Sequence, residues 1–149
     1  FWLTGDLGQA VSAWPPMLAL AIALVLAMPF ARELNLLARG LLQAQALGVA
    51  VNRLRYAVFL LASLATAASV TTAGSIGFIG LVVPHLVRLV TGNDQRLLLP
   101  ASALAGGALL MLADTLARSL IAPQQLPVGV LTALIGVPVF LFLLSRQPK

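Results

Sequence analysis

Five long apolar stretches, separated by short polar segments, restrict the folds that this sequence can adopt. They cover Trp14–Ala31, Tyr56–Thr72, Gly74–Leu89, Leu97–Ala117 and Val128–Leu144. Crossing a bilayer core of about 30 Å takes roughly 17–25 helical residues, so each stretch is long enough, or nearly so, for one crossing. Helices satisfy their own backbone groups in lipid, and the period-two alternation of a membrane β-barrel is absent from the sequence. We therefore predict an all-α integral membrane protein, a polytopic bundle of about five transmembrane helices.

The composition is typical of a protein that is surrounded by lipid. Of the 149 residues, 60% are hydrophobic and 9% are charged, whereas soluble domains carry about a quarter charged residues. The nine basic residues stand singly between apolar stretches, a pattern that speaks against nucleic-acid binding. The sequence starts at Phe1 without a recognisable signal peptide, so we expect a fragment of a longer protein.

Residues suited to catalysis or metal binding are scarce. The sequence has no cysteine and one histidine, His85, which excludes a disulfide framework and a thiolate or histidine-rich metal site. It contains no phosphate-binding loop, nucleophile elbow or paired carboxylates. We therefore expect no catalytic residue, no metal site and no cofactor bound by this chain.

The second and third apolar stretches form one nearly unbroken segment from Tyr56 to Val90, which is too long for a single crossing. Small polar residues and a glycine at 71–75 offer the natural break. We predict two helices joined there by a tight hairpin. The alternative is one helix followed by a half-helix that re-enters the membrane.

The basic residues predict an orientation, because cytosolic loops are enriched in Lys and Arg. With five crossings, every basic residue except Arg118 falls on one side of the membrane. These eight are Arg32, Arg39, Arg53, Arg55, Arg88, Arg96, Arg146 and Lys149. The pattern places the N-terminal end of the chain outside and the C-terminus in the cytosol.

The longest predicted cytosolic segment, Arg32–Arg55, contains leucines near helical spacing and two punctuating glycines. We predict two short amphipathic helices outside the bilayer in this segment. A helix lying on the lipid surface and a docking element for a cytosolic partner both fit the pattern.

Small residues mark the third and fifth stretches. Gly74, Gly77 and Gly80 would share roughly one helix face, and small residues let membrane helices approach closely. Pro84 removes a backbone hydrogen bond and favours a kink, and His85 beside it suits a structural role better than a proton or ligand site.

In the last stretch, Gly129 and Gly136 form a small face for packing or for lining a path, and Pro138 follows them. In the fourth stretch, Asp114 and Arg118 stand four residues apart and face each other on a helix. An ionisable residue in a membrane span suggests function, although pairing with Arg118 would satisfy Asp114. Arg118 breaks the charge pattern, which indicates a role outside the cell.

Together these motifs resemble the FecCD-type permease subunits of binding-protein-dependent ABC importers for iron–siderophores, haem and vitamin B12. The matching segments are Trp2–Leu7, Leu34–Leu37, Leu47–Val49, Gly74–His85, Leu99–Pro100, Ala113–Asp114 with Arg118, Leu126–Gly129 and Gly136–Pro138. They cover essentially the whole chain. The resemblance is to the second half of such a permease, helices six to ten of ten, so residues 1–149 would form a single transmembrane permease domain.

The resemblance implies several partners. Segment 33–50 would be a cytosolic coupling loop that docks on an ABC ATPase, and ATP would be used by that ATPase. The implied coupling residues are Leu34, Asn35, Leu36, Leu37, Gly40, Leu41, Leu42, Ala44, Leu47 and Gly48. Leu41 and Leu42 replace the acidic pair that usually follows the first glycine in the family. A second permease copy or paired homologue would complete the pore.

On the outer side, Arg118 matches arginines that pair with acidic residues of a periplasmic or lipid-anchored substrate-binding protein. Gln125 stands where some relatives have Glu. The implied packing or translocation-path residues are Gly74, Gly77, Gly80, Pro84, His85, Gly129, Gly136 and Pro138.

The resemblance therefore implies an ATP-driven importer permease of the bacterial inner membrane that translocates an iron chelate, haem or cobalamin. One alternative is an ion-coupled secondary transporter, which would need charged residues at the bilayer midplane. The other is a non-transporting membrane scaffold, in which the cytosolic loop would merely bind a neighbour.

Overall fold

The computed structural model describes Leu7, residues 12–120 and residues 127–145. Its elements are α1 (Trp14–Ala27), the 3-10 helix η2 (Met28–Phe30), α2 (Ala31–Ala38), α3 (Leu41–Ala46), α4 (Val51–Ala73), α5 (Ile79–Thr91), α6 (Gln95–Leu120) and α7 (Val128–Ser145). The described residues contain no strand, which confirms the predicted all-α class.

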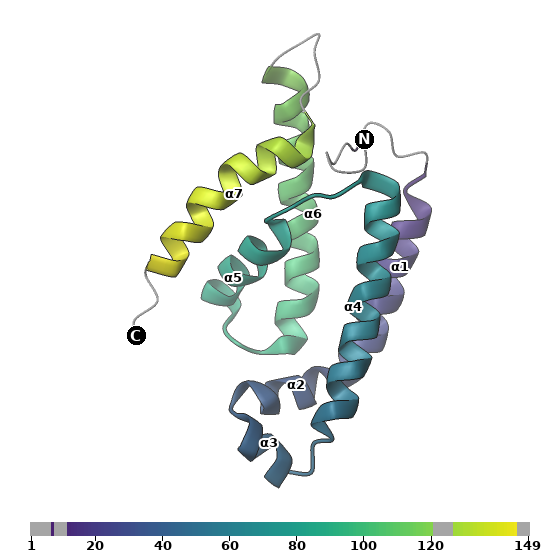
Figure 1. Ribbon diagram of the computed structural model, residues 1–149, viewed down its shortest axis with the longest axis vertical. Coiled ribbons are helices and arrows are strands. Elements are labelled where there is room, and N and C mark those ends of the chain that lie inside the picture. Colours follow the sequence, from purple (N-terminus) through teal and green to yellow (C-terminus); the bar gives the residue numbers. More distant parts are fainter. Residues whose placement is uncertain (1–6, 8–11, 121–126, 146–149) are drawn as a thin grey trace.

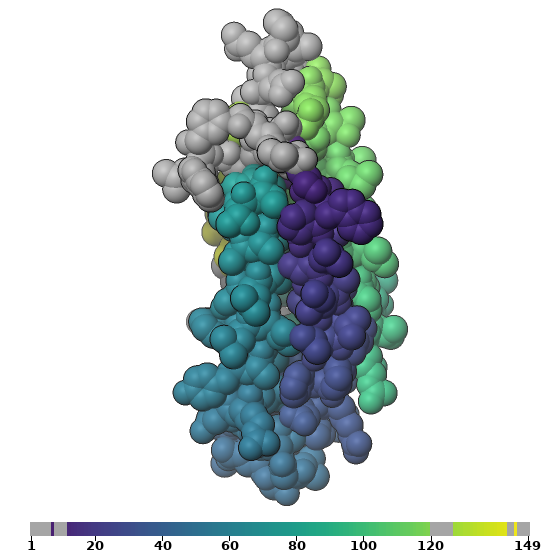
Figure 2. All heavy atoms as spheres, turned by 90° about the vertical axis from the view of Figure 1, so that its right-hand side faces the viewer, coloured from purple at the N-terminus to yellow at the C-terminus, as the bar shows by residue number. Residues whose placement is uncertain are grey.

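The long helices form two groups. In Figure 1, α1 lies beside α4, and α5 and α7 lie against α6. Figure 2 shows α1 and α4 side by side along the length of the molecule. The direction of the chain alternates from α1 through α4, α5, α6 and α7, while α2 and α3 lie across the lower end in Figure 1. This arrangement brings the predicted coupling segment to one end of the molecule.

Most large apolar side chains face outward. Val90 is 87% exposed, Leu104 78% and Leu64 68%, while Leu54 and Val128 are the largest side chains that are fully buried. Among the described residues, three helical stretches are long and apolar enough to span a membrane: Trp14–Ala38, which comprises α1, η2 and α2, Val51–Ala73 and Gln95–Ser119. An apolar surface this extensive needs lipid or further protein to cover it, so the protein belongs in a membrane.

Helix α5 is shorter than the sequence predicts. It has 13 residues, and at a rise of about 1.5 Å per residue it is about 20 Å long, less than a bilayer core. Helix α7, Val128–Ser145, has 18 residues and agrees with the predicted stretch Val128–Leu144. The chain still runs up and down alternately through α1, α4, α5, α6 and α7 (Figure 1). Because α5 is short, the irregular residues 74–78 cover the rest of the distance between the end of α4 and the start of α5.

The chain breaks within the predicted segment 71–75, and a helix lies on either side, but the tight hairpin is wrong because the irregular residues 74–78 separate the two helices. Helix α4 continues to Ala73, and Gly74 then adopts φ 72° and ψ −174°, which ends the helix. The chain stays outside regular helix until Phe78, and α5 begins at Ile79. The re-entrant alternative is also wrong, because α5 leads to the lower end and joins α6 there (Figure 1). Glycines at 74 and 77 favour this interruption, because they are poor helix formers and tolerate positive φ.

The shared face of three glycines is wrong for the same reason, because Gly74 and Gly77 precede α5. A Cβ added at Gly77 or Gly80 would meet no atom within 4 Å. Neither glycine therefore marks a close contact between described helices.

Candidate coupling and docking sites

The predicted coupling segment folds into α2 and α3, two short helices joined at Gly40. Gly40 adopts φ 136° and ψ 147°, a conformation that residues with a Cβ rarely reach, and Gly48 (φ 83°) follows α3 in the same region. Both glycines are therefore needed for the chain to fold back twice within a few residues. The two helices agree with the leucine spacing in the sequence.

The two helices differ in what they present. In α2, Leu34, Leu36 and Leu37 are half-buried. In α3, Ala44 is fully buried, while Leu42 is 80% exposed. Leu41 and Leu47, at either end of α3, are 44% and 66% exposed. Leu41, Leu42 and Leu47 are thus exposed together at this end of the molecule, and exposed apolar side chains of this kind mark surfaces that a protein partner or a membrane covers.

Asn35 connects α2 to the start of α6. Its Nδ2 donates to Asp94 Oδ1 at 2.8 Å, and its Oδ1 accepts a hydrogen bond from the Gln95 backbone N–H, also at 2.8 Å. Asp94 Oδ1 additionally accepts from the Arg96 backbone N–H at 3.0 Å. The first turn of α6 is thus capped both by its own Asp94 and by a side chain from another helix.

The charge of Asp94 is stabilised by these contacts. The hydrogen bond from Asn35 and then the one from the Arg96 backbone lower the pKa of the Asp94 carboxyl below 3.8. Asn35 is one of the predicted coupling residues, whereas Asp94 was not predicted. An Asp directly before an apolar stretch is an N-cap signal that could have identified it.

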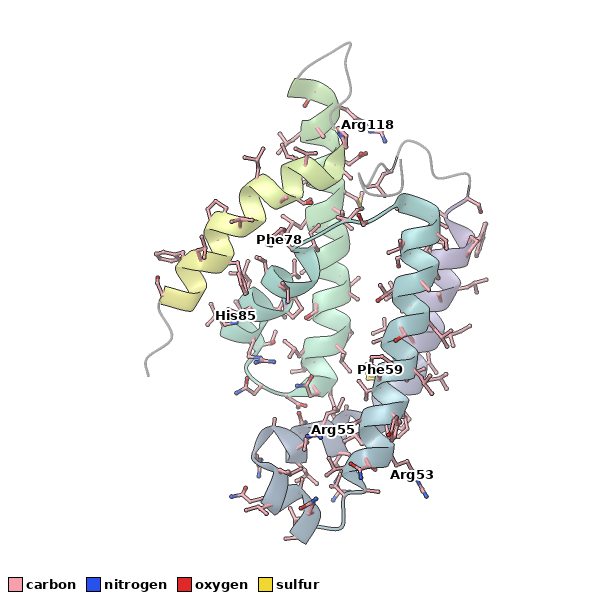
Figure 3. The ribbon with its side chains drawn as sticks, viewed as in Figure 1. Arg53, Arg55, Phe59, Phe78, His85 and Arg118 are labelled. Carbon is pink, nitrogen blue, oxygen red and sulfur yellow. The ribbon has the colours of Figure 1, made fainter. Side chains whose placement is uncertain are left out.

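An apolar groove of about 670 Å³ lies between α2 and α4. It is lined by Leu34 and Leu37 from α2 and by Leu54, Arg55, Tyr56, Val58, Phe59 and Ala62 from α4. Figure 3 shows Arg53 and Arg55 at this lower end and Arg118 at the opposite end of the molecule. Arg53 and Arg55 of α4 thus lie at the end of the molecule opposite Arg118 of α6.

At the upper end, Asp114 and Arg118 form the predicted ion pair. Arg118 Nε donates to Asp114 Oδ2 at 2.8 Å, and the side chains of Arg118 and Asp114 are 42% and 24% exposed, respectively. Gln125, the other predicted docking residue, lies outside the described residues. The pair leaves a guanidinium on the surface at the end remote from α2 and α3.

Phe78 and Gly136 meet where α5 begins. Phe78 has φ 66°, which is rare for a residue with a side chain. Gly136 on α7 is buried, and a Cβ added there would overlap the Cβ of Phe78 and lie 3.0 Å from its Cγ. The two residues border a small cavity of about 50 Å³ that Val82, Ala113 and Thr132 also line. Gly136 therefore permits α7 to approach the start of α5.

The other predicted path residues do not gather in one site. Pro84 and His85 are half-buried on α5, and Figure 3 places His85 toward the lower part of that helix. Gly129 and Pro138 lie on α7. Gly74 and Gly80 line a different cavity, of about 520 Å³, between the α4 side and the α5–α6 side, together with Ser69, Ile76 and Leu110.

Comparison with known proteins gives one consistent family. Residues 1–146 match the model of the FecCD transport family. The chain is 47% identical to the hemin transport system permease protein HmuU of Yersinia pestis over 98% of its length. It is 49% identical to the cobalamin import system permease protein BtuC of Halobacterium salinarum over 99%, and 50% identical to the Fe(3+) dicitrate transport system permease protein FecD of Escherichia coli over 98%.

The chain spans less than half the length of these relatives: 44% of HmuU, 40% of BtuC and 46% of FecD. A solved structure, described as an inward-facing conformation of a metal-chelate type ABC transporter, superposes with a TM-score of 0.85 at 36% identity. That match covers 99% of this chain and 48% of the solved chain. The interrupted α4–α5 connection and the α2–α3 end thus belong to a fold found in an ABC transporter.

Proposed function

Because the chain belongs to the FecCD transport family, we propose that it forms the second half of a transmembrane permease subunit in an ATP-driven importer. The cargo is an iron–siderophore chelate, haem or cobalamin, since relatives are named for the transport of siderophores, Fe(3+) dicitrate, hemin and cobalamin. The full subunit moves this cargo across the inner membrane, and the present chain supplies part of the wall of the path.

The observation that carries the proposal is the exposed apolar face of α3 at one end of the molecule. Leu42, at 80% exposed, lies on a short helix that Gly40 and Gly48, both at positive φ, separate from its neighbours. A cytosolic ATPase subunit docking there would cover Leu41, Leu42 and Leu47 and would transmit its motion to the membrane helices. ATP is hydrolysed by that partner, and this chain binds no cofactor and performs no chemistry.

The opposite end suits the substrate-binding protein. The Asp114–Arg118 pair offers a surface guanidinium to acidic residues of a periplasmic or lipid-anchored partner. In this proposal the α2–α3 end lies in the cytosol, the N-terminal end of the chain outside and the C-terminus inside, and the separation of the basic residues supports that orientation. A second permease copy, identical or homologous, completes the pore and covers part of the outward-facing apolar surface.

The test is transport by the full-length protein with its ATPase and binding protein in liposomes. Uptake of haemin, cyanocobalamin and radioactive ferric dicitrate is measured separately, with and without internal ATP. We expect ATP-dependent uptake of one of them, which disappears when the ATPase lacks its phosphate-binding lysine. Uptake driven by an ion gradient without ATP would contradict the proposal and favour a secondary transporter.

A further inference from the structure

Helix α6 is held at its first turn by a residue that lies outside it. The Gln95 N–H is one of the first N–H groups of α6, which have no acceptor within their own helix. Asn35 Oδ1 accepts from it at 2.8 Å, and Asn35 Nδ2 simultaneously binds the Asp94 carboxylate at 2.8 Å. One side chain of α2 is thus hydrogen-bonded to both the capping residue and the first residue of α6.

The Asn35 contact lies between the proposed ATPase-docking surface and the proposed surface for the binding protein. On one side, α2 leads through Gly40 into α3, whose exposed leucines form the proposed ATPase-docking face. On the other side, α6 is a single helix of 26 residues, about 39 Å long at 1.5 Å per residue. It carries Asp114 and Arg118 near its far end. A displacement of α2 therefore acts on the end of a rod that reaches the opposite side of the protein.

We propose that Asn35 is the positioning residue that transmits movement of the ATPase-docking element to α6, and through α6 to the binding-protein end. This inference rests on the proposed function, since it assigns a coupling role to one contact within the same subunit. Asn35 has both a donor and an acceptor on one planar amide. Its two hydrogen bonds therefore fix the position of α2 relative to the start of α6, so that the two move together. A static brace between α2 and α6 would contribute to stability without affecting communication between the ends.

The experiment uses the full-length complex with its ATPase in liposomes, and measures how far the binding protein stimulates ATP hydrolysis over the basal rate. Asn35→Leu keeps the size of the side chain and removes both hydrogen bonds. We expect stimulation to fall about fivefold or more, the low end of typical coupling between two sites. Asn52→Leu, the same change at an exposed position of α4 outside α2 and α3, is the matched control and should keep most of the stimulation.

A swapped pair separates coupling from folding. When Asn35→Asp is combined with Asp94→Asn, an amide still faces a carboxylate, and the carboxylate now carried by α2 can still accept from the Gln95 N–H. We expect Asn35→Asp alone to lower stimulation, because two carboxylates then face each other, and the double variant to recover most of it. Asp94→Asn alone still offers an acceptor to Asn35 Nδ2 and to the Arg96 N–H and should change stimulation little. Full stimulation in Asn35→Leu, or loss of stimulation that the swapped pair fails to recover, would overturn the inference while leaving the proposed function intact. A wild-type complex without ATP-dependent uptake would instead refute the proposed function.

Discussion

Phe78 at the start of α5 packs directly onto Gly136 of α7, and its backbone adopts φ 66° in doing so. A left-handed backbone at a residue with a side chain costs roughly 1 kcal/mol or more and persists when surrounding contacts hold it in place. The absence of a Cβ at Gly136 is one of those conditions, because α7 could not otherwise approach. The start of α5 is therefore held against the last helix by this contact.

We predict that Gly136→Ala destabilises the protein by about 1–3 kcal/mol, because the new methyl group overlaps Phe78 and the backbones must separate. Thermal unfolding of the full-length complex in detergent measures the effect. Gly107→Ala on α6 is the control, since a Cβ there meets no atom within 4 Å and alanine is the better helix former.

Phe78→Gly should rescue Gly136→Ala, whereas Phe78→Ala should not, since it keeps the overlapping Cβ. Equal unfolding temperatures for Gly136→Ala and Gly107→Ala would contradict the prediction.

The membrane-spanning helices could be predicted from the sequence better than the connections between them, whose conformation depends on residues far away in the chain. The apolar stretches at 56–72 and 97–117 lie within α4 and α6, because a membrane span must stay apolar throughout. The stretch at 74–89 was assigned wholly to helix, although its first residues are irregular. The conformation of Phe78 depends on Gly136, a neighbour in space that local periodicity does not reveal.

The same limit applies to the candidate site. The leucines and glycines of segment 33–50 predict two short helices, since each pattern is local. Asn35 was recognised only by resemblance, and its partner Asp94 was missed, since the contact joins residues 59 positions apart. The Asp114–Arg118 pair was predicted correctly because residues four apart are neighbours on any helix.

We predict that Asp94 makes the stability of the protein dependent on acid pH. Its pKa is lowered in the folded state, chiefly by Asn35, so its stabilising effect is complete above the unfolded value of 3.8 and is lost as the pH falls through the lowered folded value. Wild type should therefore unfold at a higher temperature than Asp94→Ala at about pH 7. The two melting curves should converge below pH 3.8. A difference that stays constant over this range would show that the carboxylate charge is irrelevant.

We predict that Arg118→Glu weakens docking of the substrate-binding protein while leaving stability almost unchanged. An exposed ion pair at i,i+4 is worth only about 0.5 kcal/mol, so its loss should hardly move the unfolding temperature. Reversing a charge at the interface should raise the dissociation constant about tenfold at low salt, and the effect should shrink near 1 M salt, where the Debye length is about 3 Å.

Arg53→Glu provides the control for this measurement, because Arg53 lies at the other end of the molecule (Figure 3). It should leave the affinity for the binding protein within about twofold of wild type, as expected for a charge separated by several Debye lengths. Equal affinities for wild type and Arg118→Glu at moderate salt would remove Arg118 from the docking surface.

We predict that Leu42→Asp weakens association with the ATPase subunit about tenfold or more, since it places a charge in the middle of an apolar docking face. Leu42 is 80% exposed, so the change costs the isolated permease little stability. Gln45→Asp, on the same short helix and also exposed, adds the same charge without removing an apolar side chain. It should weaken association less.

Both variants leave buried Ala44 in place, so their unfolding temperatures should match that of wild type. The amount of ATPase retained after washing the purified complex therefore measures docking alone. Retention of the ATPase by Leu42→Asp at the wild-type level would show that α3 is not the docking face and would favour a helix that lies on the lipid surface.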